Sequence, residues 1–277
     1  MRILSSIGRI LLGWFVLSVV QMIVGALMYR NVSPVPGVMP WLLATNLLVV
    51  AVLYLAAMRS RWRFLPLTMA LFAIPFAIVL VNLVEGVFFL GNAGIAWRTE
   101  LANSALVYLV SAPVWAILFR TPGAHSIEAQ PLAPASARGW VWRLSVSDVA
   151  YLFLYFTAGM FALPFIREFY ATQTVPSFGT IIPLQLALRG PVFIGICLLL
   201  MRMLRLERGL GALAVGLAFT ALSGVAPLLI PNPYLPDPVR WVHFVEVGAS
   251  NFLFGAFIGW LWNKGTAPAR VVAQQAV

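Results

Sequence analysis

Residues 64–90, FLPLTMALFAIPFAIVLVNLVEGVFFL, decide the fold class of this chain. The stretch is apolar around its whole circumference, and at 1.5 Å per residue it is long enough to cross a hydrocarbon core of about 30 Å. It lacks the alternation of apolar and polar residues that a membrane β-barrel requires. The stretch therefore predicts a transmembrane helix, with its one charge, Glu85, near the end.

Seven further segments have the same character: residues 8–29, 40–58, 99–119, 148–170, 181–203, 209–230 and 240–262. The first follows basic residues as a signal peptide does, but its apolar part is too long, which favours an uncleaved span. Of the 277 residues, 62% are hydrophobic and only 9% are charged, whereas a soluble domain is about a quarter charged. We therefore expect an all-α, polytopic membrane helix bundle with eight transmembrane helices.

The net charge of +10 comes from basic residues scattered over short loops. This pattern predicts topology signals and contacts with anionic lipids, and it excludes a nucleic-acid-binding domain. With the N-terminus inside, most of the 18 basic residues fall in the cytoplasm: Arg2, Arg9, Arg59, Arg61, Arg63, Arg120, Arg138, Arg143, Arg202, Arg205, Arg208, Lys264 and Arg270. We expect a multi-pass cell-membrane protein, of the bacterial inner-membrane type, with both termini cytoplasmic.

The longest loop, residues 121–147, is rich in Pro, Ala and Ser. This composition predicts a flexible cytoplasmic linker between two four-helix halves, residues 1–120 and 148–277. Ser145 or Ser147 is the expected N-cap of the helix that follows.

The two halves show a weak internal similarity. MPWLLATNLLVVAVLYLAAMRSR and IPLQLALRGPVFIGICLLLMRML both begin near a proline and end in a Met-Arg pair. A similar register between the fourth and eighth spans pairs Glu100 with Glu246. Four spans in each half would make a parallel repeat with its axis along the membrane normal. The alternative is that two apolar helices align passably whatever their origin.

Polar residues inside the spans gather toward one end of them. The candidate ligand-binding residues are Glu85, Arg189, Glu246, His243, Asn82, Gln185, Glu100 and Asn251. In the expected topology they lie in the outer half of the bilayer. Charge in a membrane is costly, so such residues usually face a bundle interior or a water-filled cavity. The sequence therefore predicts an outward-facing polar site.

Two interpretations of this cluster remain open. In the first, Arg189 pairs with Glu85 or Glu246 in a structural network that fixes helix register. In the second, the residues line a cavity that binds a small molecule, a lipid or a coupling ion. The fork of guanidinium donors on Arg189 suits a carboxylate or a phosphate. Helices broken near one of four prolines would supply further backbone groups: Pro75, Pro113, Pro164 and Pro227.

Metal and redox chemistry have little support. His243, Glu246, Glu85 and Glu100 resemble a carboxylate-histidine ligand set, but the chain has only two histidines, and one is in the linker. That scarcity also disfavours a bis-histidine haem. The single cysteine cannot form an intrachain disulfide or a CxxC site. We predict no metal ligand and no catalytic residue, and the sequence names no cofactor.

Residues 184–193, LQLALRGPVF, resemble the EExxxRG segment of the CAAX-type (ABI) intramembrane protease family. His243 and Asn251, followed by FGAFIGWLW, are similar to that family's last motif. Leu184 and Gln185 stand where the family has its two glutamates, so no carboxylate pair is present there to activate water. The resemblance covers two short stretches and implies a degenerate relative at most.

The expected function is that of a permease-like or small-molecule- or lipid-binding membrane protein, and catalysis is the less favoured class. The apolar inner halves of the spans show no inner pathway, which counts against transport. The alternatives are a non-catalytic structural or assembly subunit of a membrane complex and the degenerate protease relative. The expected partners are membrane lipids, with a small-molecule ligand or a partner membrane subunit in addition.

Overall fold

The computed structural model is a helix bundle of the membrane type. It describes residues 2–30, 36–90, 96–120, 132, 136–232 and 234–264. Within these ranges, eight helical spans are long and apolar enough to cross a membrane. The only β structure in the same ranges is two isolated bridges. The expected all-α polytopic bundle is confirmed.

Six of the spans are uninterrupted helices: α1 (Arg2–Met28), α2 (Val38–Ser60), α3 (Phe64–Phe89), α4 (Trp97–Phe119), α5 (Ala137–Tyr170) and α10 (Asp237–Trp262). The other two contain a π-helical segment. One span consists of α6 (Phe178–Leu184), η2 (Gln185–Arg189) and α7 (Gly190–Leu204). The other consists of α8 (Arg208–Phe219), η3 (Thr220–Val225) and α9 (Ala226–Leu229).

Each π segment ends just before a proline. The N–H of Gly190 bonds to the carbonyl of Gln185, and Pro191 follows. The N–H of Ala226 bonds to the carbonyl of Ala221, and Pro227 follows. A proline inside a helix lacks the N–H for the usual bond and crowds the carbonyl four residues earlier, so the helix widens locally.

The prediction of breaks at prolines is therefore only partly right. Pro75, Pro113 and Pro164 lie inside the uninterrupted helices α3, α4 and α5. Of the four expected positions, Pro227 alone adjoins an irregular segment, and Pro191 was not among them.

Helix α5 begins earlier than expected. Its N-cap is Ser136, whose hydroxyl accepts a hydrogen bond from the Gly139 N–H at 3.2 Å. The predicted N-cap at Ser145 or Ser147 is wrong, because the run between Ser136 and Ser147 holds no proline that would stop a helix. Ser147 is instead buried inside the helix and accepts a bond from the Trp262 indole N–H at 2.9 Å. Most of the remaining predicted linker lies outside the described residues.

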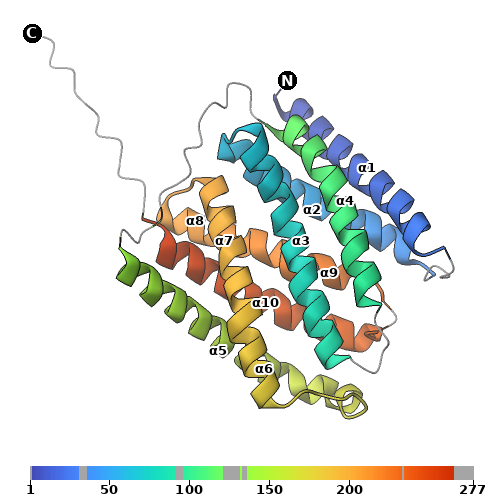
Figure 1. The fold of residues 1–277 in the computed structure, drawn as a ribbon, viewed down its shortest axis with the longest axis vertical. Coiled ribbons are helices and arrows are strands. Elements are labelled where there is room, and N and C mark those ends of the chain that lie inside the picture. Colours follow the sequence, from blue (N-terminus) through green and yellow to red (C-terminus); the bar gives the residue numbers. More distant parts are fainter. Residues whose placement is uncertain are drawn as a thin grey trace, which may run out of the picture.

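The spans run up and down, so their connections fall at two ends of the bundle (Figure 1). We call the end where α2, α4, α6 and α10 begin the predicted outer end, and the other the predicted inner end. Helix α1 begins and α10 ends at the predicted inner end. Helices α1 and α5 lie at opposite margins of the view in Figure 1. In α1 and in α5, only 17% of the most apolar 18-residue stretch is buried. In the α6–α7 and α8–α9 spans, half of the corresponding stretch is buried.

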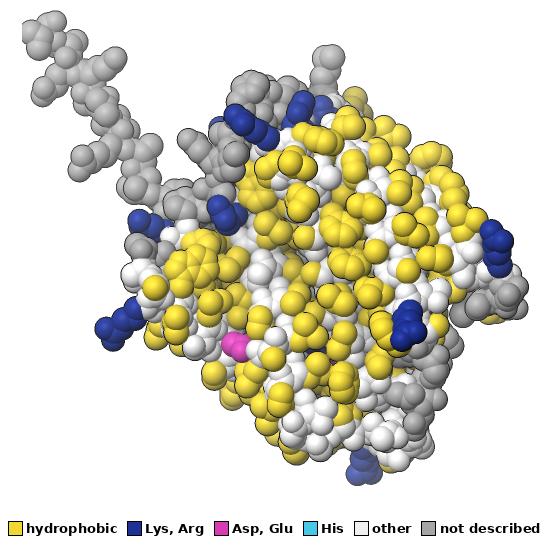
Figure 2. Space-filling model, viewed as in Figure 1, with side chains coloured by type: hydrophobic (Ala, Val, Ile, Leu, Met, Phe, Trp, Pro, Cys, Tyr) yellow, Lys and Arg dark blue, Asp and Glu magenta, His cyan; other side chains and the backbone are white. Residues whose placement is uncertain are grey.

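The two halves share one hydrophobic core. Helix α2 packs against α7 and α9, and α3 packs against α7, while α10 packs against α5, α8 and η3. The surface in Figure 2 is largely hydrophobic, with basic side chains mainly around its margin. This distribution is that of a membrane protein whose charged residues lie beside the lipid head groups.

Candidate functional site: a buried ion pair beside an apolar groove

The centre of the polar cluster is an ion pair between Arg189 of η2 and Glu85 of α3. The Arg189 side chain is 8% exposed and that of Glu85 is 20% exposed. A second guanidinium nitrogen of Arg189 donates to Asn82 Oδ1 at 3.3 Å, one turn before Glu85 on α3. Arg189 therefore pairs with one of the two carboxylates that the sequence offered, and the pair joins the two halves of the bundle.

Gln185 connects this ion pair to α5. Its amide nitrogen donates to Glu85 Oε1 at 3.4 Å, and its amide oxygen accepts from the Tyr151 hydroxyl at 3.2 Å. Tyr155, one turn further along α5, also interacts with Glu85. The Arg189 guanidinium lies 6.0 Å from the centre of the Tyr155 ring. Tyr151 and Tyr155 therefore complete the polar cluster from the α5 side.

His243 and Glu246 form a second group on α10. His243 Nδ1 lies 2.7 Å from Glu246 Oε2, and His243 Nε2 lies 2.9 Å from the hydroxyl of Tyr170, the last residue of α5. A hydroxyl, an imidazole and a carboxylate thus form one hydrogen-bonded chain along which a proton can be transferred. Glu246 also acts electrostatically on Arg189 and Tyr151, so the two groups are neighbours.

Glu246 lies on the wall of an apolar groove of about 600 Å³ between α5 and α10. Its Oε1 lies near Gly159 of α5, 3.8 Å from where a Cβ would stand. Nearly all of the remaining lining is apolar. The lining residues are Leu154, Thr157, Ala158, Phe161, Ala162, Phe165, Trp241, Val242, Val245, Glu246, Ala249, Ser250 and Leu253.

Two predicted site residues lie elsewhere. Glu100, in the first turn of α4, is close to Tyr29, which follows α1. Asn251 donates to Ser223 Oγ of η3 at 2.9 Å, and Ser223 in turn donates to the Phe219 carbonyl. Asn251 thus forms a hydrogen bond with a side chain of the π segment, because its position on α10 faces η3. The structure brings together Glu85, Arg189, Asn82, Gln185, His243 and Glu246.

Asp148 of α5 was not among the predicted residues. Its Oδ1 is buried without a hydrogen-bond partner among the described residues, and it lies against Gly190 at the end of η2. A Cβ at position 190 would displace this carboxylate, so the glycine leaves room for the Asp148 side chain. Asp148 also acts electrostatically on Tyr151. Its position three residues before Tyr151, directly before the uncharged run of residues 149–166, was the available sequence signal.

Arg240 of α10 is another buried cation, and it was not among the predicted site residues. It is 2% exposed. Its guanidinium donates to the carbonyls of Leu228 and Leu229 at 2.7 and 3.1 Å, and it bonds to Asp237 at 2.9 Å. Arg240 thus satisfies the carbonyl end of α9, which the following turn leaves without helical partners.

Among the described residues, no three His, Cys, Asp or Glu side chains come together in a way that could hold a metal ion. The second histidine, His125, lies outside the described residues. Comparisons of the chain with protein-family models, curated proteins and solved structures find no match.

Proposed function

We propose that this integral membrane protein binds one amphiphile in the groove between α5 and α10, with the apolar chain along the groove and the polar head at Glu246. The observation that carries the proposal is a carboxylate on the wall of an otherwise apolar groove. A volume of about 600 Å³ lies within the usual range for small-molecule sites, roughly 300–1,000 Å³.

The lateral position of the groove favours a ligand that arrives from the bilayer. Its rim residues Phe161, Phe165 and Val245 are 70–77% exposed and lie on the outer surfaces of α5 and α10. Apolar rims beside lipid select an apolar chain, because such a chain moves from one hydrocarbon environment into another. A permease would also need a continuous polar path, and the groove does not supply one.

The chemistry of Glu246 selects the head group. One of its oxygens is held by His243, and the other lies near Gly159 of α5. A carboxylate oxygen accepts hydrogen bonds, so the head should carry hydroxyl or amine donors. Thr157 and Ser250 are also in the lining; the Ser250 hydroxyl donates to the Val247 carbonyl and can still accept a hydrogen bond. In the proposed topology, with both termini cytoplasmic, this head lies in the outer half of the bilayer.

Binding of radiolabelled 1-monooleoylglycerol to the purified protein tests the proposal, since this probe has one chain and two hydroxyl donors. Ala249→Trp, which fills the groove, should abolish binding. Glu246→Gln should weaken binding about tenfold or more, as expected for loss of a charged hydrogen bond of roughly 1.5–3 kcal/mol. Leu213→Trp, at an exposed position of α8, is the matched control. Wild-type affinity in the Ala249→Trp variant would refute the groove as the binding site.

A second candidate function is hydrolysis of a groove-bound ester or peptide. The row Tyr170–His243–Glu246 favours it, because a carboxylate that orients an imidazole is the arrangement of a general base. Turnover of a fluorogenic lipid ester that disappears in His243→Gln would support this function. Equal turnover in the wild type and in the His243→Gln variant would exclude His243 as the base.

A further inference from the structure

Helix α5 carries an exposed stripe at its predicted inner end. Its members follow one another at spacings of four, three, four and four residues, so they share a helix face. They are Arg138, Trp142, Ser145, Val149 and Phe153, and all are exposed. A basic residue and a tryptophan at one end, followed by a serine and then two apolar residues, match the order of head group, interface and hydrocarbon in a bilayer leaflet.

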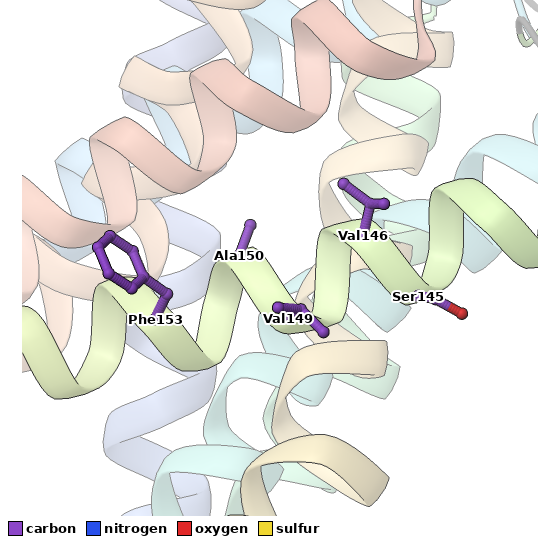
Figure 3. A pocket seen from close by; sticks show the side chains of 5 residues that line it. All are labelled: Ser145, Val146, Val149, Ala150 and Phe153. Atoms are coloured by element: carbon purple, nitrogen blue, oxygen red, sulfur yellow. The ribbon is translucent and has the colours of Figure 1, made fainter.

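A shallow hollow of about 440 Å³ lies over the apolar part of this stripe. In Figure 3, Val146, Ala150 and Phe153 project from the same side of α5. Five residues of this one helix line the hollow: Ser145, Val146, Val149, Ala150 and Phe153. The hollow is separate from the Glu246 groove, whose α5 lining begins at Leu154 and continues toward the predicted outer end.

Two arginines are fixed where this surface meets the end of α10. Arg143 of α5 donates through Nε to the Leu261 carbonyl at 3.3 Å. Arg208 of α8 donates through Nε to the Trp260 carbonyl at 3.0 Å. These carbonyls belong to consecutive residues, so both guanidinium groups are anchored to the same last turn of α10.

The same arginines are also stacked on tryptophans. The guanidinium of Arg143 lies 5.3 Å from the centre of the Trp142 ring, and that of Arg208 lies 4.2 Å from the Trp260 ring. Stacking and the Nε bonds restrict both side chains while using only one nitrogen of each. Within the described part of the chain, neither arginine forms a salt bridge to a carboxylate. Two oriented cations without an anion form a site for a phosphate.

We propose that an anionic phospholipid occupies this surface, with its phosphate between Arg143 and Arg208 and one acyl chain in the hollow on α5. The phosphate supplies an anion to two guanidinium groups that form no salt bridge among the described residues. The acyl chain covers the stripe from Ser145 to Phe153. This site does not depend on the amphiphile groove and lies toward the other end of α5.

The test is native mass spectrometry of the full chain with dioleoylphosphatidylglycerol, dioleoylphosphatidylcholine or inorganic phosphate. Wild-type protein should retain one phosphatidylglycerol at least tenfold more strongly than phosphatidylcholine. The double variant Arg143→Gln/Arg208→Gln should bind both lipids equally. The matched control, Arg98→Gln/Arg167→Gln, removes two exposed cations from the predicted outer end, one of them stacked on Trp97 in the same way. It should bind phosphatidylglycerol as the wild type does.

Selective phosphatidylglycerol binding that persists in the double variant would overturn the proposal. Inorganic phosphate that binds and displaces the lipid would also overturn it, since the site would then recognise a free anion. If the double variant does not fold, Val149→Trp fills the hollow without altering either arginine and should lower phosphatidylglycerol binding to the phosphatidylcholine level. Binding of 1-monooleoylglycerol should be unchanged in all of these variants, which separates this site from the Glu246 groove.

Discussion

At the scale of single residues, Arg189 shows how one buried charge organises its neighbours. It is held by Glu85 and Asn82 on α3, and it stacks at 5.0 Å over Phe193 one turn further along its own span. A buried guanidinium is tolerated only if it is paired, because the cost of removing it from water is large. The ion pair therefore constrains how α3 meets η2.

Glu85→Leu should destabilise the protein by about 3–5 kcal/mol, because it leaves Arg189 buried without its carboxylate. The double variant Glu85→Leu/Arg189→Met should recover most of this loss, since apolar side chains can replace a buried pair at little cost. Unfolding in mixed micelles with increasing dodecyl sulfate measures the stability of the single and the double variant. Glu168→Leu, at an exposed position of α5, is the control. Additive effects of the two substitutions would contradict the pairing.

Tyr29 gives a prediction about alkaline pH. Burial and the neighbouring Glu100 raise the pKa of the Tyr29 hydroxyl above its ordinary value of about 10. The folded state thus favours the protonated phenol. Its contribution to stability is complete below pH 10 and is lost as the pH rises above 10, where the unfolded chain ionises first.

Absorbance at 295 nm, which reports tyrosinate, tests this shift. In the folded protein, titration curves of wild type and Tyr29→Phe should coincide up to about pH 11, because Tyr29 contributes no tyrosinate in that range. A wild-type curve higher by one tyrosine at pH 11 would show that the pKa is not raised.

At the scale of helices, the contact between α8 and α10 depends on glycines. A Cβ on Gly259 would stand 2.8 Å from the Cα of Ala212, and one on Gly255 would stand 2.9 Å from the Cα of Gly216. These neighbours are backbone atoms, so no side-chain rotation relieves the clash. The close approach places α10 against α8 and η3 and so determines which face of α10 carries Glu246 toward α5.

Gly259→Ala should therefore destabilise the protein by about 1–3 kcal/mol, the usual cost of overpacking. Gly195→Ala on α7 is the matched control, because nothing lies within 4 Å of its Cβ position. The control should be stabilised by up to about 1 kcal/mol through helix propensity. Thermal unfolding in detergent distinguishes the two outcomes, and equal midpoints would refute this packing.

At the scale of the whole molecule, the even number of spans puts the start of α1 and the end of α10 at one end of the bundle. The helix ends and connections at that end carry Arg59, Arg61, Arg63, Arg120, Arg202, Arg205 and Arg208. By the positive-inside rule this end should be cytoplasmic. The polar cluster and the head-group end of the groove would then face the outer leaflet.

Cysteine labelling in intact cells tests this orientation. The background variant Cys197→Ala removes the single cysteine, which is fully buried. In that background, Arg98→Cys should react with a membrane-impermeant maleimide, and Arg120→Cys should react only after permeabilisation. The reverse pattern would invert the topology and place the candidate site on the cytoplasmic side.

The sequence by itself determined the membrane class, the eight spans and the end of the bundle at which polar residues gather. These follow from length and hydropathy, because each span must satisfy its own backbone within the bilayer. It also restricted the partners of Arg189 to two carboxylates. The choice of Glu85, the addition of Tyr151 and Tyr155, and the separation of Asn251 from the cluster were decided by the tertiary structure alone.

The physical reason is rotation about the helix axis. Apolar residues surround each span, so hydropathy does not indicate which face turns inward. The π segments before Pro191 and Pro227 further change the rotation of the residues on either side of them. Only the packing of α3, α5, η2 and α10 fixes those rotations, and with them the groove beside Glu246.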